Sequence, residues 1–452
     1  MKHLCLKIFC ILSLLALSAQ AVFPQCEISV GKGERAADWD QTFTQNGPGK
    51  GLEPAGMPGW TGADSTISIE LPNGDSAFFF SDSFIAESPA KPGDGRVYTN
   101  ENGLRLREPN CLPPICGPKP EHIHYVYNSI VVRSKDGKTL KTLVGEKDKN
   151  GYSTAYFKPP NSNDPNVMYW LGDPFLIDVK GGKKIWIFLN EWRVARPFDK
   201  SFFLDFRGQA IAQLDAETLE IESINPLKNL VDEGVWGISV WLDEGDGKTL
   251  YIYGMKNTDE IKEARKSDIE LANKYKKLYI AKTDASKGIE AVADQKNWRV
   301  WNGKKWVKGL KKRVSIIPEK DSISDELTIK RLNIGGKPVF VMATFDTSVG
   351  YFDWKDLYLY SACRPEGPFV NKYFFYRTPT AGQTKLPGML PSESLQSGLS
   401  VYNPHLHPQF TEDGKLLVSY NSNLPFGAKP GDSIYADFYK PRFVWVPIEG
   451  LE

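Results

Sequence analysis

A recurring pattern of polar and apolar positions dominates the chain. A polar start, an apolar strand, a glycine-containing turn, a second apolar strand and a polar end occur five times. The clearest copy is residues 402–423, in which His405–Phe410 and Leu416–Ser419 flank the turn Glu412–Lys415. Glycine supplies the positive φ that tight hairpin turns require. The other four turns each contain glycine, at residues 72–75, 181–184, 245–248 and 335–338, so the pattern predicts five hairpins.

The strands that flank these turns can be placed from their apolar runs. The first strands are predicted at Asp64–Leu71, Asp173–Val179, Gly237–Leu242, Glu326–Ile334 and His405–Phe410. The second strands are predicted at Ser76–Phe80, Ile185–Leu189, Thr249–Tyr253, Val339–Ala343 and Leu416–Ser419. A third run follows each hairpin, at Tyr125–Arg133, Gln209–Leu214, Lys277–Lys282, Asp356–Ala362 and Arg442–Pro447. Five similar β units that pack on their neighbours predict an all-β fold, a five-bladed β-propeller.

The segments outside these units divide the chain further. Residues 22–59 are rich in glycine, proline and polar residues and are predicted to form an N-terminal extended arm, with the propeller spanning residues 60–452. Residues 87–120 are a long insertion that could shape a pocket at the rim. Residues 258–276 have a helical pattern, and Trp298–Trp306 reads as an outer hairpin around Asn302-Gly303.

Residues 1–21 read as a secretory signal peptide. Lys2 and Lys7 precede or border the apolar run Ile8–Leu17, and Ala19-Gln20-Ala21 fits the cleavage pattern. No other segment is apolar and long enough to span a membrane. We therefore expect a secreted or periplasmic protein without an integral membrane segment.

Four cysteines follow the predicted signal peptide: Cys26, Cys111, Cys116 and Cys363. An even number in an exported chain favours disulfides. Cys111 and Cys116 could pair with each other or bridge to distant segments such as Cys26, and the sequence leaves the connectivity open. Zinc is the less favoured alternative, because no second Cys or His pair has suitable spacing.

Charge and aromatic content narrow the expected partners. The chain carries 56 Lys and Arg against 55 Asp and Glu, for a net charge of +1. With the charges evenly mixed, we expect no nucleic-acid partner and no membrane-surface partner. Aromatic residues make up 12% of the chain, including 12 Trp. Some of these rings are expected to line a binding surface, although aromatic propeller strands would also explain them.

Candidate chemistry lies where the repeated units bring polar residues together. The start of the first strand and the end of the second strand of an antiparallel hairpin share one edge, so the polar starts should meet at one end of a propeller channel. The residues collected there are Asp64, Asp82, Asp173, Glu191, Glu233, Asp325 or Glu326 with Asp346, His405, His407 and Asn421. Each also has a structural interpretation, such as a loop cap, a turn residue or a buried histidine. Paired carboxylates suit glycoside hydrolysis, with Trp60, Trp170, Trp192 and Trp236 as surfaces on which sugars could stack.

Familiar motifs of other enzyme classes are absent. The sequence contains no Gly-x-Ser-x-Gly elbow, no His-Glu-x-x-His, no P-loop and no dinucleotide fingerprint. No cofactor is therefore expected to be required.

Three segments resemble a known family: residues 60–84 (WTGADSTISIELPNGDSAFFFSDSF), 124–132 (HYVYNSIVV) and 402–421 (YNPHLHPQFTEDGKLLVSYN). They resemble an exported, largely uncharacterised family of bacterial propellers. That family is similar to endo-D-arabinofuranosidases, and more distantly to the five-bladed arabinanase, levansucrase and invertase superfamily.

The resemblance implies roles for individual residues. It implies that Asp64 is the nucleophile or base, and that Asp173 orients sugar and tunes the acid. Glu233 is the nearest match for the general acid, although it precedes its expected strand, and Asp82 matches an aspartate of the arabinofuranosidases. It also implies calcium near a channel histidine, for which His407 is the candidate.

The sequence thus predicts a secreted, monomeric glycoside hydrolase that acts on a furanose-rich or related polysaccharide or oligosaccharide. A carbohydrate-binding propeller without catalysis is the first alternative. A sialidase-like or lyase propeller is the second, and it would require an arginine cluster for which only Arg193 and Arg196 are candidates.

Overall fold

The computed structural model describes most of the chain after residue 25. The described residues are 26–40, 59–86, 123–137, 139–149, 151–160, 162, 164–194, 204–230, 234–257, 276–347, 355–378, 400–423 and 440–452. They fold almost entirely as β-strands, which confirms the all-β prediction. The helical elements among them that can be bounded are single turns: η4 (Ala285–Lys287), α3 (Ile289–Val292), η5 (Gln295–Asn297) and η6 (Leu310–Lys312). No helix in the described ranges is long and apolar enough to cross a membrane.

The strands form five larger antiparallel sheets and one small sheet. Sheet I contains β3 (Ile67–Glu70), β4 (Ser76–Phe80), β7 (Ser129–Arg133) and β8 (Leu140–Leu143). Sheet II contains β9 (Val167–Val179), β10 (Gly182–Val194), β11 (Leu204–Asp215) and β12 (Ile221–Pro226). Sheet III contains β13 (Val235–Leu242), β14 (Thr249–Asn257), β15 (Lys276–Asp284), β16 (Arg299–Trp301) and β17 (Trp306–Lys308). Sheet IV contains β18 (Thr328–Ile334), β19 (Lys337–Phe345), β20 (Asp356–Ala362) and β21 (Asn371–Arg377). Sheet V contains β22 (Ser400–Glu412), β23 (Lys415–Asn423), β24 (Lys440–Pro447) and, at its outer edge, β1 (Glu34–Arg35).

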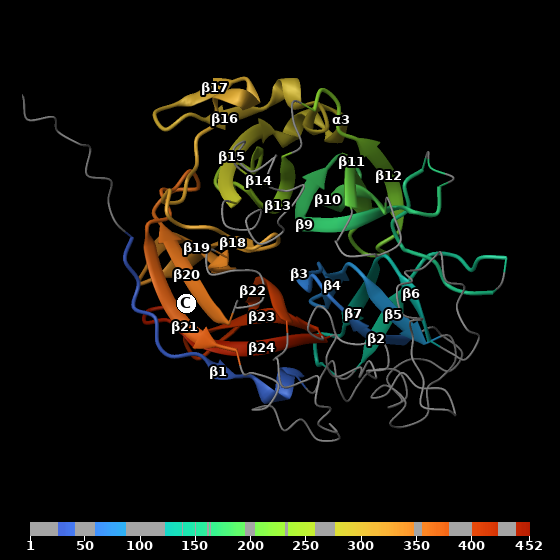
Figure 1. The fold of residues 1–452 in the computed structure, drawn as a ribbon, viewed down its shortest axis with the longest axis horizontal. Helices are drawn as coiled ribbons and strands as arrows, with labels where there is room; N and C mark the ends of the chain where they lie inside the picture. Colours follow the sequence, from blue (N-terminus) through green and yellow to red (C-terminus); the bar gives the residue numbers. More distant parts are fainter. Residues whose placement is uncertain are drawn as a thin grey trace, which may run out of the picture.

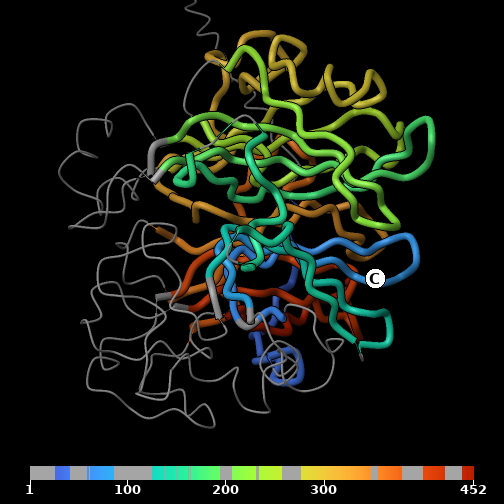
Figure 2. Tube along the Cα trace, turned by 90° about the vertical axis from the view of Figure 1, so that its right-hand side faces the viewer, coloured from blue at the N-terminus to red at the C-terminus, as the bar shows by residue number. Residues whose placement is uncertain are grey.

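The small sheet contains β2 (Gly59–Ala63), β5 (Ser83–Ala86) and β6 (Ile123–Val126). The five larger sheets are arranged around a common centre (Figure 1). Their first strands contact one another in the order β3, β9, β13, β18 and β22, and β22 contacts β3 again. Seen from the side, the half that holds sheet III lies opposite the half that holds sheets I and V (Figure 2).

The hydrophobic core is divided among the five spaces between neighbouring sheets. One buried cluster lies between each successive pair of sheets, from I and II round to V and I. The consecutive residues Phe78, Phe79 and Phe80 show how a strand serves two such clusters, because side chains alternate across a sheet. Phe79 packs toward sheet II, whereas Phe78 and Phe80 pack toward sheet V.

The predicted strands agree closely with those observed. Ser76–Phe80 is confirmed with its predicted bounds, and the outer hairpin around Gly303 is confirmed as β16 and β17. Residues 125–133 were predicted as one strand but form two, β6 and β7, separated at Asn128. The buried Asn128 side chain accepts from Phe157 N and donates to Phe157 O and Tyr169 O, so it ties this break to the start of sheet II. The predicted signal peptide, the insertion at 87–120, the helix at 258–276, Cys111 and Cys116 lie outside the described residues.

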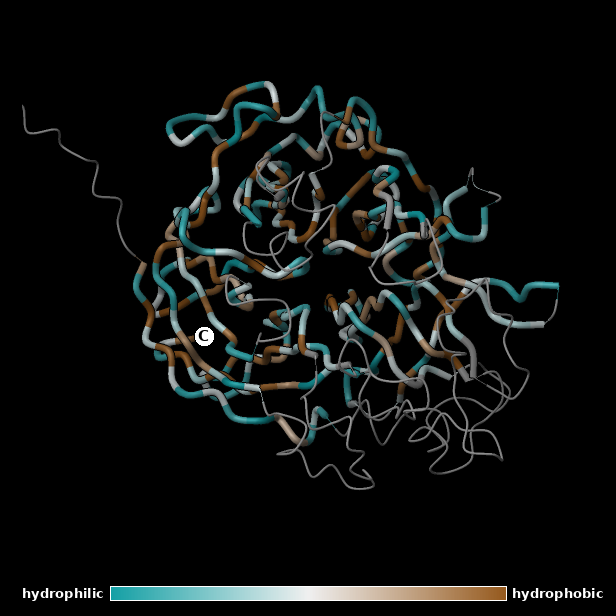
Figure 3. Tube along the Cα trace, viewed as in Figure 1, coloured by the Kyte–Doolittle hydropathy of each residue, from teal (hydrophilic) through white to brown (hydrophobic). Residues whose placement is uncertain are grey.

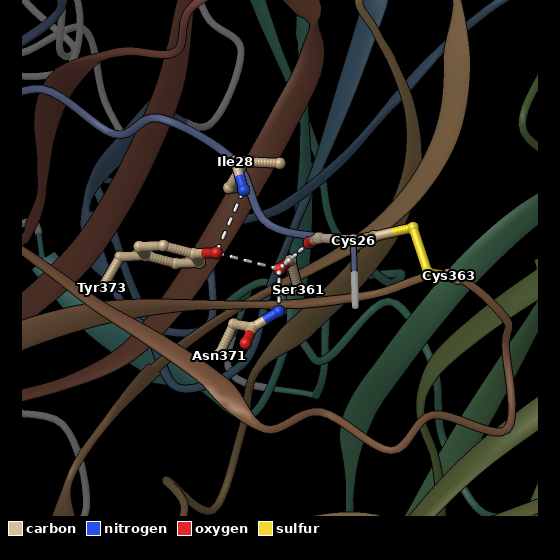
Figure 4. Close-up of a disulfide and its surroundings, with 6 residues drawn as sticks. All are labelled: Cys26, Ile28, Ser361, Cys363, Asn371 and Tyr373. Atoms are coloured by element: carbon tan, nitrogen blue, oxygen red, sulfur yellow. Dashed lines mark hydrogen bonds between the residues drawn. A yellow bond between two sulfur atoms is a disulfide. The ribbon is translucent and has the colours of Figure 1, made fainter. Parts of the chain in front are cut away.

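The N-terminal segment is fastened to sheets IV and V. Cys26 forms a disulfide with Cys363, which lies just after β20 (Figure 4). Ser361 Oγ donates to Cys26 O, and Ile28 N donates to Tyr373 Oη at 3.0 Å. Farther along, β1 pairs with β24. The sequence left open a bridge from Cys111 or Cys116 to Cys26, whereas in the structure Cys26 pairs with Cys363.

Removing this disulfide is expected to destabilise the protein without changing its fold. The bridge joins residues 337 positions apart, and a long closed loop restricts the unfolded chain strongly. The double variant Cys26→Ser/Cys363→Ser should lose about 2–5 kcal/mol of unfolding free energy, measured by chemical denaturation of the mature chain. Reduction of the wild type with dithiothreitol should have a similar effect, and an unchanged midpoint would contradict this role.

Candidate active site

The first strands are irregular near their starts, at the end of the sheets where the polar residues were predicted to meet. The pairing of β9 with β10 shifts at Gly172-Asp173, and that of β22 with β23 shifts just after Tyr402. Asn403 has φ 51°, and in sheet I Ser65 and Thr66 have φ 74° and 63°. Positive φ is unfavourable for a β-branched residue such as Thr66. Strained backbone of this kind persists only where the surrounding contacts hold it, and it is common at functional sites.

Asp64 is held immediately before this strained segment. Its carbonyl oxygen accepts from Ser81 N at 3.1 Å. The fully buried Asn421 donates through Nδ2 to Ala63 O at 3.3 Å and to Thr66 Oγ1 at 2.9 Å, so it clamps both sides of Asp64. Asn421 was predicted to bind substrate, but its burial and these bonds make it a residue that positions the Asp64 loop.

The Asp64 carboxylate itself is partly exposed. Tyr402 Oη donates to Asp64 Oδ2 at 3.3 Å. Tyr402 and Asn421 lie opposite each other on β22 and β23. Of this pair, Asn421 holds the backbone on either side of Asp64 and Tyr402 contacts the Asp64 carboxylate.

Asp82 lies at the corner between β4 and β5, one residue from Ser81. Its Oδ1 accepts from Trp170 Nε1 at 3.2 Å. The corner is fixed to sheet II, because Leu171 N donates to Ser81 Oγ at 3.2 Å. Ser81 N also donates to the Asp64 carbonyl oxygen, so the loops that carry Asp64 and Asp82 are linked through Ser81.

The tyrosine Tyr127 lies beside this pair. Burial raises the pKa of the Tyr127 phenol, and the carboxylates of Asp82 and Asp164 raise it further. Asp164 itself accepts from Arg193 Nε at 2.8 Å. Arg193 is therefore engaged by a carboxylate, which weakens the sialidase-like alternative.

Two of the predicted aromatic surfaces are suitably placed. Trp170 and Trp192 are partly exposed, with ring centroids 5.6 Å apart. Trp60 and Trp236 are each only 2% exposed and pack against Phe80 and Trp298 respectively. The prediction that Trp60 and Trp236 stack on sugar is therefore corrected: both are core residues.

Asp173 belongs to a different network. It is 1% exposed and accepts four hydrogen bonds: Lys330 Nζ lies 3.0 and 2.8 Å from its two oxygens, and Ser239 Oγ and Val240 N each lie 2.9 Å from Oδ2. These partners come from sheets III and IV. The geometry corrects the catalytic prediction for Asp173 to a buried ion pair that joins three sheets.

His407 is also structural. It is fully buried, with Nδ1 2.5 Å from Ser68 Oγ and Nε2 2.8 Å from Ser419 Oγ. Both ring nitrogens have partners, so the residue does not fit the predicted roles of substrate contact or calcium ligand. In the ranges that the structure describes, no group of three His, Cys, Asp or Glu side chains is arranged to hold a metal ion.

The buried His407 predicts how stability depends on pH. Burial lowers its pKa well below the ordinary value of 6.5, with His405 and Lys330 contributing. Below pH 6.5 the unfolded chain takes up a proton that the native state does not, so stability should fall as pH decreases from 6.5, by up to about 1.4 kcal/mol per unit. His407→Gln should remove this part of the slope, measured by urea unfolding between pH 5 and 8. An identical slope in the variant would contradict the assignment.

His405 and Glu326 form a polar pair on neighbouring sheets. His405 is 1% exposed, and its Nδ1 lies 2.6 Å from Thr328 Oγ1. Its Nε2 lies 3.7 Å from Glu326 Oε2, which is too long for a hydrogen bond. Neither of these two atoms has a hydrogen-bond partner among the described residues. Both atoms are buried, and the substrate-binding role of His405 stays a prediction.

The other sequence candidates are placed as follows. Asp325 pairs with Lys276 and Asp346 with Lys372. Glu191 accepts from the buried Tyr169, whose pKa is raised by burial and by this carboxylate. Glu233 lies outside the described residues.

The contacts of Tyr402 and Tyr127 with the aspartates, and the bonds by which Ser81 holds the two loops, were not predicted from the sequence. An irregularity in the strands could have been predicted at two places, because Asn, Gly or Pro next to an apolar strand often marks a bulge. These places are Tyr402-Asn403-Pro404 and Leu171-Gly172-Asp173-Pro174. Their partners on other sheets carried no signal in the local pattern.

Comparisons with known proteins agree with this fold. A model of the family described as "Domain of unknown function (DUF5005)" matches residues 118–447. A protein from Bacteroides ovatus that is provisionally described as a hydrolase has a similar structure, with a TM-score of 0.60 and 18% identity over 95% of this chain and 97% of that chain. At that identity the likeness shows a shared fold.

Two further solved structures are more distant. A glycosyl hydrolase from Bacteroides ovatus has a TM-score of 0.41 at 11% identity, covering 92% of this chain and 94% of that chain. An α-L-arabinanase from Penicillium chrysogenum has a TM-score of 0.35 at 11% identity, covering 92% and 98%. No curated protein matches the chain.

Proposed function

The chain belongs to the family described as a domain of unknown function, DUF5005, and because that description names no activity, we propose one from the site itself. The protein is a secreted glycoside hydrolase that acts on a furanose-rich or related polysaccharide. Its five larger sheets are the blades of a five-bladed propeller, and the reaction takes place where the first strands begin.

One observation carries the proposal: two partly exposed carboxylates, Asp64 and Asp82, sit on loops joined through Ser81. Glycoside hydrolysis needs one carboxylate that attacks the sugar or activates water and another that protonates the leaving oxygen. Asp64 is the nucleophile or base, the role that the sequence resemblance implies for it, and the Tyr402 hydroxyl donates to its carboxylate. Asp82 and Glu233 share the acid role.

The surroundings of the pair suit a neutral sugar polymer. The partly exposed rings of Trp170 and Trp192 offer apolar faces beside Asp82, and sugar rings stack on such faces. His405 Nε2 and Glu326 Oε2 supply polar atoms for a hydroxyl group. The preference for furanose sugars rests on the sequence resemblance. No cofactor is required for this chemistry.

A second function, carbohydrate binding without hydrolysis, is favoured by one specific observation. The unsatisfied atoms of His405 and Glu326 would serve a bound sugar equally well in a protein that does not cleave it. Paired aspartates on strained, clamped loops favour the hydrolase, because binding alone does not need two neighbouring carboxylates.

Release of sugar fragments distinguishes the two functions. The purified mature chain is incubated with arabinan, arabinogalactan, fructan and galactan, and products are separated by anion-exchange chromatography. The hydrolase predicts fragments from at least one polymer. If a polymer-containing gel retards the protein but no fragments are released, the carbohydrate-binding function replaces the hydrolase. If the protein neither releases fragments nor is retarded, both functions are contradicted.

Loss of the Asn421 clamp is expected to impair the site indirectly. Asn421→Ala removes the two bonds that Asn421 donates to the Asp64 loop, which should lower the hydrolysis rate about tenfold and the unfolding free energy by about 1–3 kcal/mol. Asn73→Ala is the matched control, since Asn73 lies in an exposed turn. Full activity in the Asn421 variant would contradict the positioning role.

A further inference from the structure

A local concentration of positive charge lies at the outer edge of sheet III. We name residues 299–313, which comprise β16, β17 and η6, the basic hairpin. The segment contains Arg299, Lys304, Lys305, Lys308, Lys311, Lys312 and Arg313, and no Asp or Glu. The whole chain has a net charge of only +1. The excess of positive charge in the basic hairpin is therefore local to this segment.

The cations of the basic hairpin face solvent. All of them except Arg313 are exposed, and in the part of the chain that the structure describes none of these six takes part in an ion pair. The outer loops at the top of Figure 3, which include this hairpin, are coloured largely as hydrophilic. Lysines on an edge strand also discourage unwanted strand pairing, so the charge alone does not define a binding surface.

Aromatic rings interleaved with the lysines provide the second observation. Trp301 and Trp306 are register partners across β16 and β17, with centroids 5.5 Å apart, and both are partly exposed. Lys282 Nζ, from β15, lies 4.6 Å from the Trp306 centroid, and the Tyr251 ring, from β14, lies 5.7 Å from the Trp306 ring. The rings are inclined to one another, by 56° between Trp301 and Trp306 and by 61° between Tyr251 and Trp306. The result is a cluster of partly exposed aromatic rings beside the exposed lysines.

We propose that the basic hairpin is an ancillary binding surface for an anionic polysaccharide. The carboxylate or sulfate groups of such a polymer pair with the lysines, while a sugar ring packs on the exposed part of Trp301 or Trp306. β16 and β17 are the strands of sheet III farthest from β13, so the surface is separate from the site at the start of the first strands (Figure 1). The inference does not depend on the proposed hydrolase activity.

Two other anionic partners fit less well. A membrane surface would require large apolar side chains that can insert, whereas Trp301 and Trp306 are half-buried against their own sheet. Nucleic acid would satisfy the same charges, but a chain that carries a disulfide fits an oxidising, exported setting, where polysaccharide is the available polymer.

The test is electrophoresis of the mature chain through gels that contain polygalacturonate or dextran sulfate, with neutral galactan gels as the reference. We expect retardation by at least one anionic polymer, and the two polymers distinguish carboxylate from sulfate. Lys304→Glu/Lys305→Glu/Lys308→Glu should weaken binding roughly tenfold or more, since each lost or reversed surface pair contributes modestly and the effects accumulate. Raising the salt concentration should weaken wild-type binding as well.

Matched controls distinguish binding at the basic hairpin from binding to positive charge anywhere on the protein. Lys149→Glu/Lys158→Glu/Lys320→Glu changes three exposed lysines elsewhere by the same charge and should bind as the wild type does. Trp306→Ala should weaken binding while Trp306→Phe largely preserves it, with thermal unfolding confirming that each variant is folded. The proposal is overturned by no retardation, by equal losses in the two lysine triples, or by tighter binding to single-stranded DNA or phosphatidylglycerol vesicles.

Discussion

Asp64→Asn is expected to abolish hydrolysis while leaving the fold intact. The substitution keeps the size of the side chain and its contact with Tyr402 Oη, but it removes the negative charge that attacks the sugar or activates water. Loss of a catalytic base typically reduces rates by 10²- to 10⁴-fold, and loss of a nucleophile by more. We therefore expect a decrease of roughly 10³-fold or more in fragment release.

The matched control is Glu70→Gln, which neutralises an exposed carboxylate at the end of β3, the strand that follows Asp64. It should retain wild-type activity. Circular dichroism and the unfolding midpoint establish that both variants are folded. If Asp64→Asn releases sugar at the wild-type rate, Asp64 is not the nucleophile or base.

The largest effect on stability is expected from breaking the Asp173–Lys330 pair. Asp173→Ala leaves Lys330 Nζ and Val240 N without this acceptor, and the Lys330 side chain is 20% exposed. Removing one partner of a buried ion pair typically costs about 3–5 kcal/mol, and the partial exposure of Lys330 places the expected cost at the lower end of that range. We expect a loss of this size in the unfolding free energy, measured by urea denaturation.

Two comparisons sharpen this prediction. Asp173→Ala/Lys330→Met removes both charges and should lose less stability than the two single variants together. Asp178→Ala breaks the pair with Lys183, whose side chains are 80% and 52% exposed, and should cost less than about 1 kcal/mol. Equal losses from Asp173→Ala and Asp178→Ala would contradict the structural role of Asp173.

The local pattern was sufficient to predict most of the fold. Alternation of apolar residues and glycine turns located all five hairpins, because a strand such as Ser76–Phe80 carries its own signal in the side chains that it buries. The same reasoning brought Asp64 and Asp82 together, since both flank strands of one hairpin unit.

Contacts between sheets could not be predicted in this way. Asp173 meets Lys330 across 157 positions, and Asn421 meets Thr66 across 355. Nothing in the residues around Asp173 distinguishes a catalytic carboxylate from a buried ion pair until its partners are known. Likewise, Trp60 and Trp170 have similar sequence surroundings, and only the packed structure shows that one is core and the other partly exposed.

The net charge of the whole chain gave no indication of the basic hairpin. A net charge of +1 suggested evenly mixed charges, yet the basic hairpin carries only positive ones. Its aromatic turn was recognised as an outer hairpin, but the surface that it forms with Lys282 and Tyr251 depends on the neighbouring strands of sheet III.

The central claim, that Asp64 and Asp82 act as a catalytic pair, is tested most directly by the pH dependence of kcat/KM for fragment release. Wild-type protein should give a bell-shaped profile whose upper limb lies above the ordinary carboxyl pKa of about 4, because one carboxyl group must be ionised and the other protonated. Asp82→Asn should lower the rate and flatten the upper limb. A monotonic wild-type profile, or no fragments from any polymer at any pH, would contradict the account.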